Sequence, residues 1–186
     1  DPDQVVANDI ELKAPYCLLL ITGSNTGGKT VTLKTTGLLA MMALSGLAIP
    51  VKEATIPFYD AIYCDLGDEQ SIEQSLSTFS SHIKKIISIL DNVTHRSLVL
   101  IDEIGSGTDP REGESLAQAI LDRLLEYHCH VLSSTLYSGL KKYAQENPNV
   151  LYASVEFDLE TMKPTYHLLN HVIGQSYAFE ISSRLG

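Results

Sequence analysis

Short apolar runs alternate along the chain with longer stretches in which apolar residues recur every three or four positions. The uninterrupted runs have the length of strands that are buried on both faces of a parallel sheet. Such runs occupy residues 17–21 and 97–101, and shorter ones occupy 48–51 and 61–64. Residues 131–135, which begin with Val and Leu, also predict a strand. Helical patterns lie between them, over residues 32–45, 111–128 and 140–145. This alternation predicts an α/β fold with a mostly parallel central sheet flanked by helices.

The two ends of the chain and the short strands depart from this pattern. Pro50 and Pro57 limit the strands at 48–51 and 61–64 to sheet edges or strand ends. Alternation with a period of two predicts an antiparallel hairpin from residues 152–157 and 165–168, and the last helical pattern covers 176–185. Residues 5–10 are the only apolar stretch before the first strand, and they allow two interpretations. One is an irregular edge strand, and the other is a segment lying over the base of a nucleotide.

A serine-rich segment, residues 67–82, leads into another helical pattern. We expect Ser77 or Thr78 to cap this helix, because a hydroxyl there accepts a hydrogen bond from the first turn. A hydroxyl pair at a helix start also suits an anion, although capping and solvation alone account for such residues. The apolar residues expected on the face that packs against the core are Ile83, Ile86, Ile87 and Leu90.

Between the first strand and the first helix lies a glycine loop that fits the P-loop pattern, Gly, four residues, then Gly-Lys-Thr. Glycines let successive backbone N–H groups surround a phosphate, and the helix N-terminus adds positive partial charge. We expect Lys29 to reach the β- and γ-phosphates of a nucleotide and the Thr30 hydroxyl to bind Mg²⁺. An ordinary glycine-rich turn is the alternative. The predicted ATP-binding residues are Gly23, Ser24, Asn25, Thr26, Gly27, Gly28, Lys29, Thr30 and Val31.

Two carboxylates follow the apolar run at residues 97–101. In a doubly wound sheet the carboxyl end of such a strand faces the ligand crevice. We expect Asp102 to hold Mg²⁺, directly or through water, and Glu103 to orient and polarise an attacking water. A surface acidic pair is the alternative, but the glycine loop upstream favours a nucleotide-hydrolysing site.

Length and composition limit the remaining possibilities. A chain of 186 residues with 44% hydrophobic residues forms one sizeable domain, covering 1–186. Its apolar runs are shorter than the about 20 residues that a membrane helix needs, so we expect no membrane contact. It begins with Asp1 instead of Met, which we interpret as a fragment of a longer protein. The formal net charge of −10 disfavours nucleic-acid binding by this segment alone. The three cysteines have no spacing typical of disulfides or metal sites, which favours a reducing cytoplasm.

Taken together, these motifs resemble the ATPase domain of the MutS family, which belongs to the larger ABC class. The resemblance is strongest to the second bacterial branch, here called MutS-two, which differs from the mismatch-recognising branch. It covers nearly the whole chain and is highly specific. The segments that carry it are 26–35, 67–82, 100–103, 105–110, 153–158 and 178–181.

The resemblance implies a homodimer in which two ATPase domains pair head to tail across their nucleotides. Ser77 and Thr78 would then form a signature that reaches the γ-phosphate bound to the partner. It also implies lever and clamp arms before Asp1, and a dimerising segment and a nuclease domain after Gly186. Structured or branched DNA, suppression of recombination and rescue of collided ribosomes are roles of that branch, carried by regions outside this chain.

Two positions depart from the family pattern. Leu136 stands where the family usually has a histidine that senses the γ-phosphate, and leucine cannot donate a hydrogen bond. Ser24 replaces the usual proline of the loop and adds backbone freedom. Lys29, Asp102 and Glu103 favour an ATPase, with ATP and Mg²⁺ as cofactors, whereas Leu136 favours a dimerisation switch with little turnover. A small-molecule kinase and a nuclease within this segment are disfavoured, since a kinase has no use for the serine-rich segment and a nuclease needs a second carboxylate cluster.

Overall fold

The computed structural model describes residues 5–24, 28–67, 75–174 and 183, with residues 75–78 described by their backbone alone. The strands are β1 (Leu18–Thr22), β2 (Ala61–Asp65), β3 (Ser97–Ile101), β4 (His130–Ser134), β5 (Val150–Asp158) and β6 (Lys163–Asn170). The helices of this part of the chain are α1 (Lys29–Leu44), α2 (Ser75–Asn92), α3 (Pro110–Glu126) and α4 (Ser138–Glu146). The alternating α/β order expected from the sequence is confirmed.

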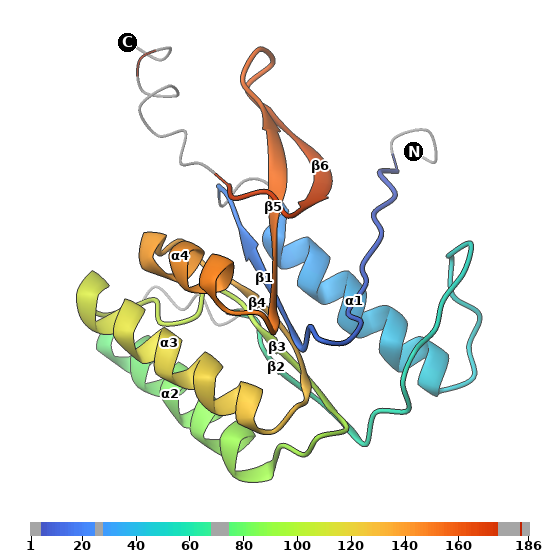
Figure 1. The fold of residues 1–186 in the computed structure, drawn as a ribbon, viewed down its shortest axis with the longest axis horizontal. Coiled ribbons are helices and arrows are strands. Elements are labelled where there is room, and N and C mark those ends of the chain that lie inside the picture. Colours follow the sequence, from blue (N-terminus) through green and yellow to red (C-terminus); the bar gives the residue numbers. More distant parts are fainter. Residues whose placement is uncertain (1–4, 25–27, 68–74, 175–182, 184–186) are drawn as a thin grey trace.

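The strands form one mixed sheet of six, in the order β2-β3-β4-β1-β5-β6. Every neighbouring pair is parallel except β5 and β6, which form the expected antiparallel hairpin. Figure 1 shows this hairpin extending beyond the rest of the sheet. Because β4 lies between β1 and β3, the loops that follow these three strands emerge side by side at the carboxyl edge of the sheet.

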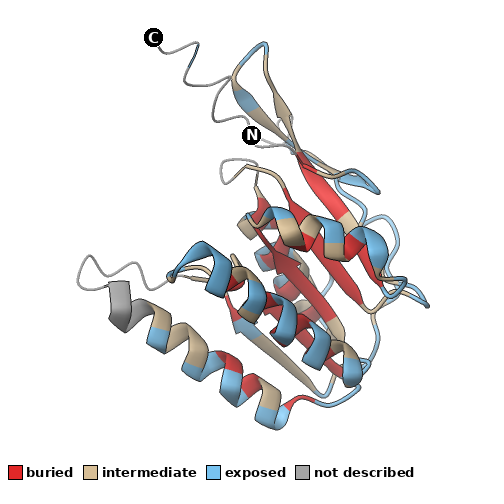
Figure 2. Cartoon of the chain, turned by 60° about the vertical axis from the view of Figure 1, so that its left-hand side comes forward, coloured by how far each residue is buried: buried red, intermediate tan, exposed pale blue. Residues whose placement is uncertain are grey.

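The two faces of the sheet are covered by different helices. Alternate residues of β1 point to opposite faces, so that Leu19 and Ile21 pack with Leu33 of α1, while Leu18 and Leu20 pack with α2, α3 and α4. Figure 2 shows the consequence, since the central strands of the sheet are buried and the helices expose their outer surfaces. The continuous apolar runs of β1 and β3 are therefore required by burial on both faces.

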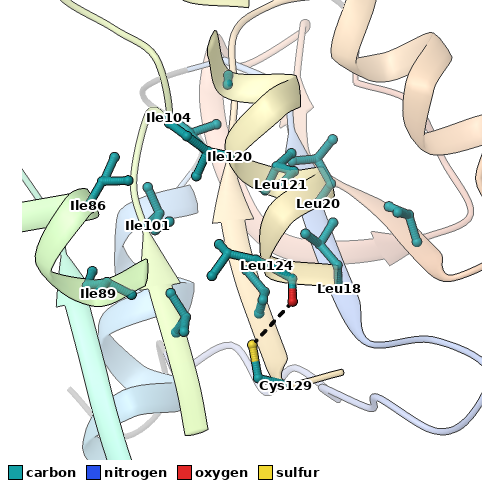
Figure 3. Close-up of a cluster of buried hydrophobic side chains, with 14 of the residues drawn as sticks. Leu18, Leu20, Ile86, Ile89, Ile101, Ile104, Ile120, Leu121, Leu124 and Cys129 are labelled. Carbon is teal, nitrogen blue, oxygen red and sulfur yellow. Dashed lines mark hydrogen bonds between the residues drawn. The ribbon is translucent and has the colours of Figure 1, made fainter. Parts of the chain in front are cut away.

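The larger core cluster lies under α2 and α3, and Figure 3 shows its side chains meeting over β1, β3 and β4. Leu121 and Leu124 of α3 have no exposed surface, and the Cys129 thiol donates to the Leu124 carbonyl at 3.7 Å. Burial raises the pKa of this thiol to about 11, so Cys129 is a structural residue held as a neutral thiol.

Two expectations from the sequence are wrong, and a third is not tested. Residues 48–51 form no strand, because Pro50 has no N–H and the Val51 N–H donates back to the Ile49 carbonyl at 2.9 Å. Ile87 is 52% exposed, and Ile89 takes the core position instead. The predicted closing helix at 176–185 lies outside the described residues except for position 183.

Helix boundaries also differ from those expected. Helix α2 begins at Ser75, so neither Ser77 nor Thr78 is its N-cap. Helix α1 begins at Lys29, directly after Gly28, and is therefore three residues longer at its N-terminus than the apolar pattern indicated. The glycine loop thus passes into the helix without a linker, which places Lys29 and Thr30 in its first turn.

Leu121→Ala should lower the free energy of unfolding by about 2–5 kcal/mol, because it leaves a cavity at a fully buried position of α3. Leu38→Ala is the matched control, since Leu38 of α1 is 54% exposed and its truncation should cost less than about 0.5 kcal/mol. Urea denaturation followed by circular dichroism measures both values. Equal losses in the two variants would contradict the assigned core.

Candidate functional site

The candidate site lies at the carboxyl edge of the sheet, where β1, β4 and β3 end next to one another. The glycine loop follows β1, Ser134 is the last residue of β4, and Asp102 follows β3. Hydrogen bonds join these three strand ends. The Thr30 hydroxyl donates to Asp102 Oδ2, and the Ser134 hydroxyl donates to Asp102 Oδ1. The structure therefore brings the two predicted Mg²⁺ ligands, Thr30 and Asp102, into direct contact.

Glu103 leaves β3 through a backbone conformation that is uncommon for a residue with a side chain. Its φ is 47°, in the left-handed region. The Glu103 N–H donates to Ser134 Oγ at 2.7 Å, and the Ile104 N–H donates to the Ser134 carbonyl at 3.2 Å. Ser134 thus holds this turn on both sides. Unusual backbone held by such contacts is frequent at functional sites, which agrees with a role for Glu103 there.

Lys29 is buried although it is charged, with 2% of its surface exposed. Its ammonium group donates to the Gly23 carbonyl at 2.6 Å, so the lysine folds back over the start of its own loop. Burial lowers the pKa of Lys29, and the nearby carboxylates of Glu103 and Asp102 partly offset this by favouring the charged form. A cation placed in this way suits the phosphates of a nucleotide.

The start of α1 is arranged differently from that of α3. Asp109 caps α3 by accepting from the Arg111 N–H at 3.0 Å and from the Glu112 N–H at 3.4 Å. The N-cap of α1 is Gly28, with φ at 96° and no side chain to accept such bonds. Gly28 itself therefore supplies no side-chain cap to this first turn, as a phosphate site at a helix N-terminus requires.

The predicted loop residues fall into two groups. Gly23 and Ser24 lie in the described loop, and Val31 lies in the first turn of α1 with 59% of its surface exposed. Gly23 also has positive φ, at 114°, as a loop that turns directly after β1 requires. The predicted residues that lie outside the described part of the chain are Asn25, Thr26 and Gly27.

Tyr166 of β6 lies against the loop, which sequence reasoning missed. A methyl group on Gly28 would be 2.9 Å from Tyr166 Cδ1, so only glycine leaves room for this ring. The Tyr166 backbone has φ at 63°, and Asn8 holds it: the Asn8 amide donates to the Tyr166 carbonyl at 2.8 Å and accepts from the Leu168 N–H at 2.7 Å. Residues 5–13 form no strand, so the edge-strand interpretation of the N-terminal segment is wrong.

A second pair of residues joins α2 to the same edge. Nδ1 of His82 lies 2.8 Å from both carboxylate oxygens of Asp65, the buried last residue of β2. The Asp65 carbonyl accepts from the Asp102 N–H at 2.8 Å, so α2 is connected to the end of β3. The backbone places Ser77 and Thr78 in the first turn of α2, and their side chains lie outside the described part.

Leu136 follows β4 and is 49% exposed. Its neighbours are firmly held: the Thr135 N–H donates to the Ile21 carbonyl at 3.1 Å, and the Tyr137 hydroxyl donates to the Gly105 carbonyl at 2.7 Å. The backbone at position 136 is thus fixed near the site, while the leucine side chain offers no hydrogen bond.

The donors at this edge fit Mg²⁺. The Thr30 hydroxyl and the Asp102 carboxylate are hard oxygen ligands, and Mg²⁺ in nucleotide sites typically uses one or two such protein ligands with phosphate and water. Over the described ranges, no cluster of three or more His, Cys, Asp or Glu residues is arranged to hold a metal ion. A Mg²⁺ ion on this oxygen pair would therefore take its further ligands from phosphate and water.

Together, the strand–glycine loop–helix unit and the carboxylate after β3 define an α/β protein of the P-loop class. Residues 19–186 match MutS domain V. The chain is 58% identical over 186 residues to the "Putative endonuclease MutS2" of Bacillus subtilis (strain 168), covering 100% of this chain and 24% of that relative. It is 57% identical over 185 residues to the "Endonuclease MutS2" of Clostridium perfringens (strain SM101 / Type A), covering 99% of this chain and 24% of the relative. The chain belongs to the MutS family.

The match confirms the resemblance to the MutS family. It also limits what the names of the relatives say about this chain, because the match covers only part of each relative. The chain spans about a quarter of the length of the curated relatives it matches, 24% in each of these two cases. What their names describe therefore concerns proteins about four times as long. Among the described residues, no helix is both long enough and apolar enough to cross a membrane.

Ser134→Ala should raise the Mg²⁺ concentration needed for half-maximal ATP turnover by about 10-fold, because it removes the group that orients Asp102 and the Glu103 turn. Ser133→Ala is the control, since the buried Ser133 hydroxyl donates to the Ser134 carbonyl at 3.5 Å and to no site carboxylate. A Mg²⁺ titration of turnover separates the two. If both variants behaved alike, Ser134 would have no positioning role.

Proposed function

We propose that this chain is the ATP-binding and ATP-hydrolysing domain of a longer MutS2-type protein. The observation that supports this most strongly is the contact between Thr30 and Asp102 beside the buried Lys29. These three residues come from the start of α1 and the end of β3, which are far apart in sequence, and they supply the hydroxyl, the carboxylate and the cation that a magnesium-bound triphosphate needs.

Each residue takes a specific role in hydrolysis. Lys29 contacts the β- and γ-phosphates, and backbone N–H groups at the start of α1, where the N-cap is a glycine, bind phosphate oxygens. Thr30 and Asp102 would hold Mg²⁺, which would supply positive charge to neutralise the phosphates. Glu103 orients a water for attack on the γ-phosphorus and accepts its proton. The Tyr166 ring, which lies against Gly28, offers a surface for the base of the nucleotide, as does the segment around Asn8.

We further propose that the active form is a homodimer with composite sites. Ser77 and Thr78 lie in the first turn of α2, whose N-terminus favours an anion. The Asp65–His82 contact fixes this helix to the edge that carries Asp102. Movement of α2 against a partner's nucleotide is therefore connected to the site of its own domain.

The rest of the longer protein supplies nucleic-acid contacts. The net charge of −10 does not suit a phosphate backbone, which binds clustered Lys and Arg. We place DNA binding, ribosome association and the nuclease activity named for the relatives outside this chain. ATP hydrolysis in these residues would then power or gate a dimeric protein that acts on structured DNA or the ribosome in the cytoplasm.

Glu103→Gln should retain ATP and Mg²⁺ binding but slow hydrolysis by about 10²-fold or more, because the amide cannot accept the proton of the water. Lys29→Ala should instead abolish binding, since it removes the cation that faces the phosphates. Isothermal titration and a phosphate-release assay measure binding and turnover separately. Unchanged ATP affinity in Lys29→Ala would refute the P-loop assignment.

Mixing inactive proteins tests the composite site. Ser77→Ala should lower turnover while leaving ATP binding intact, because its hydroxyl acts on the partner's phosphate. A mixed dimer of Ser77→Ala and Lys29→Ala protein contains one intact site, so activity should partly recover. Sedimentation confirms that mixed dimers form under the assay conditions. No recovery in those dimers would exclude a signature that acts across the interface.

A second candidate function is an ATP-dependent dimerisation switch with little turnover, and Leu136 favours it. This exposed leucine offers no hydrogen bond to a γ-phosphate. Leu136→His should raise turnover if the missing donor limits hydrolysis, by at most about 10²-fold for one oriented donor. Leu136→Phe controls for side-chain size. Turnover in the natural protein that already matches Leu136→His would favour the efficient ATPase.

A further inference from the structure

The chain returns to the glycine loop after β6, at Gly174. This residue is buried, and its N–H donates to the Thr22 hydroxyl at 2.8 Å across 152 residues of sequence. A methyl group on Gly174 would lie 2.5 Å from the Gly23 nitrogen and 2.6 Å from the Gly23 Cα. Two glycine backbones therefore pack directly against each other, and no side chain fits between them.

The carbonyl side of Gly174 is held as well. The ammonium group of Lys141, from α4, donates to the Gly174 carbonyl at 2.6 Å. The Thr22 hydroxyl in turn donates to the Ala153 carbonyl at 3.0 Å, so it bridges β5 and Gly174. Burial lowers the pKa of Lys141, because removal from water disfavours the charged form. Gly174 is thus held on both sides by residues of separate elements.

The backbone of Gly23, the residue that Gly174 covers, has little conformational freedom. Its φ is 114°, and a methyl group there would lie 3.0 Å from Val155 Cγ2. Its carbonyl accepts the hydrogen bond from the Lys29 ammonium group at 2.6 Å. The same glycine therefore contacts β5, Gly174 and the lysine that faces the phosphates, and a shift of Gly174 has to move Gly23 or open this packing.

We infer that Gly174, held by Thr22 and Lys141, is a positioning element of the phosphate loop. It keeps Gly23 in the conformation from which the loop can surround the phosphates and from which Lys29 is directed. The inference rests on the proposed ATP site. It adds residues that lie outside the P-loop pattern and that have no contact with phosphate assigned to them.

The packing of Gly174 on Gly23 also couples the nucleotide site to the chain that follows residue 174. Any force on the chain after residue 174 acts at a residue packed on the first glycine of the loop. By linkage, a segment that changes the position of Gly174 changes ATP affinity, and ATP changes that segment by the same free energy. The coupling needs no direct contact between the segment and the nucleotide.

The test measures ATP and ADP binding by titration in the purified full-length protein. Gly174→Ala should weaken both by about 10-fold or more, since one misplaced backbone segment can cost up to about 10²-fold at such a site. Gly46→Ala is the control for replacing a glycine away from the loop, because a methyl group there meets no atom within 4 Å and any backbone strain at its φ of 76° leaves Gly23 untouched. Both variants should unfold cooperatively without nucleotide, and only Gly174→Ala should lose the ATP-induced rise in melting temperature.

Variants of Lys141 provide a second test of the inference, because they add no atoms between the packed glycines. Lys141→Met should weaken ATP binding in the same direction, and Lys141→Arg should restore part of it, because arginine can still donate to the Gly174 carbonyl. Wild-type ATP affinity in both Gly174→Ala and Lys141→Met would overturn the inference. Failure of the natural protein to bind ATP would instead refute the proposed function, so the two failures are distinguishable.

Discussion

The geometry of the site depends on β4 lying between β1 and β3. Two strand spacings separate the ends of β1 and β3 by roughly 10 Å, which is too far for the loop and the carboxylate to meet by themselves. The two side chains meet next to the end of β4, where the Thr30 hydroxyl, from α1, donates a hydrogen bond to the Asp102 carboxylate, which follows β3. A small residue with a hydroxyl at the end of β4, Ser134, leaves room for both and bonds to Asp102. The strand order thus creates the site.

Burial of a charge at this edge requires compensation, and the fold supplies it. Lys29 is almost fully covered, and an isolated ammonium group in such a place would favour its neutral form. The Gly23 carbonyl accepts its hydrogen bond, and Glu103 and Asp102 provide opposite charge. The same carboxylates would repel a triphosphate in the absence of Mg²⁺. The charges of the lysine and the carboxylates would therefore balance those of a bound metal and phosphate.

Three elements outside the P-loop pattern contact this edge, each from a different direction. Helix α2 is joined to it through His82 and Asp65, β6 places Tyr166 against Gly28, and the chain after β6 packs Gly174 on the loop. A dense arrangement of this kind transmits displacements instead of absorbing them. It provides physical routes by which nucleotide binding and distant parts of a larger protein can affect one another.

The sequence alone determined the α/β class, most strands, the glycine loop and the acidic pair, because burial on both sheet faces and backbone freedom at glycine leave patterns in neighbouring residues. It left 48–51 and Ile87 wrongly assigned, since local patterns do not show which hydrogen bonds or helix face the rest of the chain takes up. Only the tertiary structure shows the contacts of Ser134 and of Gly174, which lies 152 residues from its partner Thr22. A serine at the end of an apolar strand was a weak signal for the first. Nothing near Gly174 in sequence indicates the glycine it covers, because that contact exists only once β1, β5 and α4 have assembled around it.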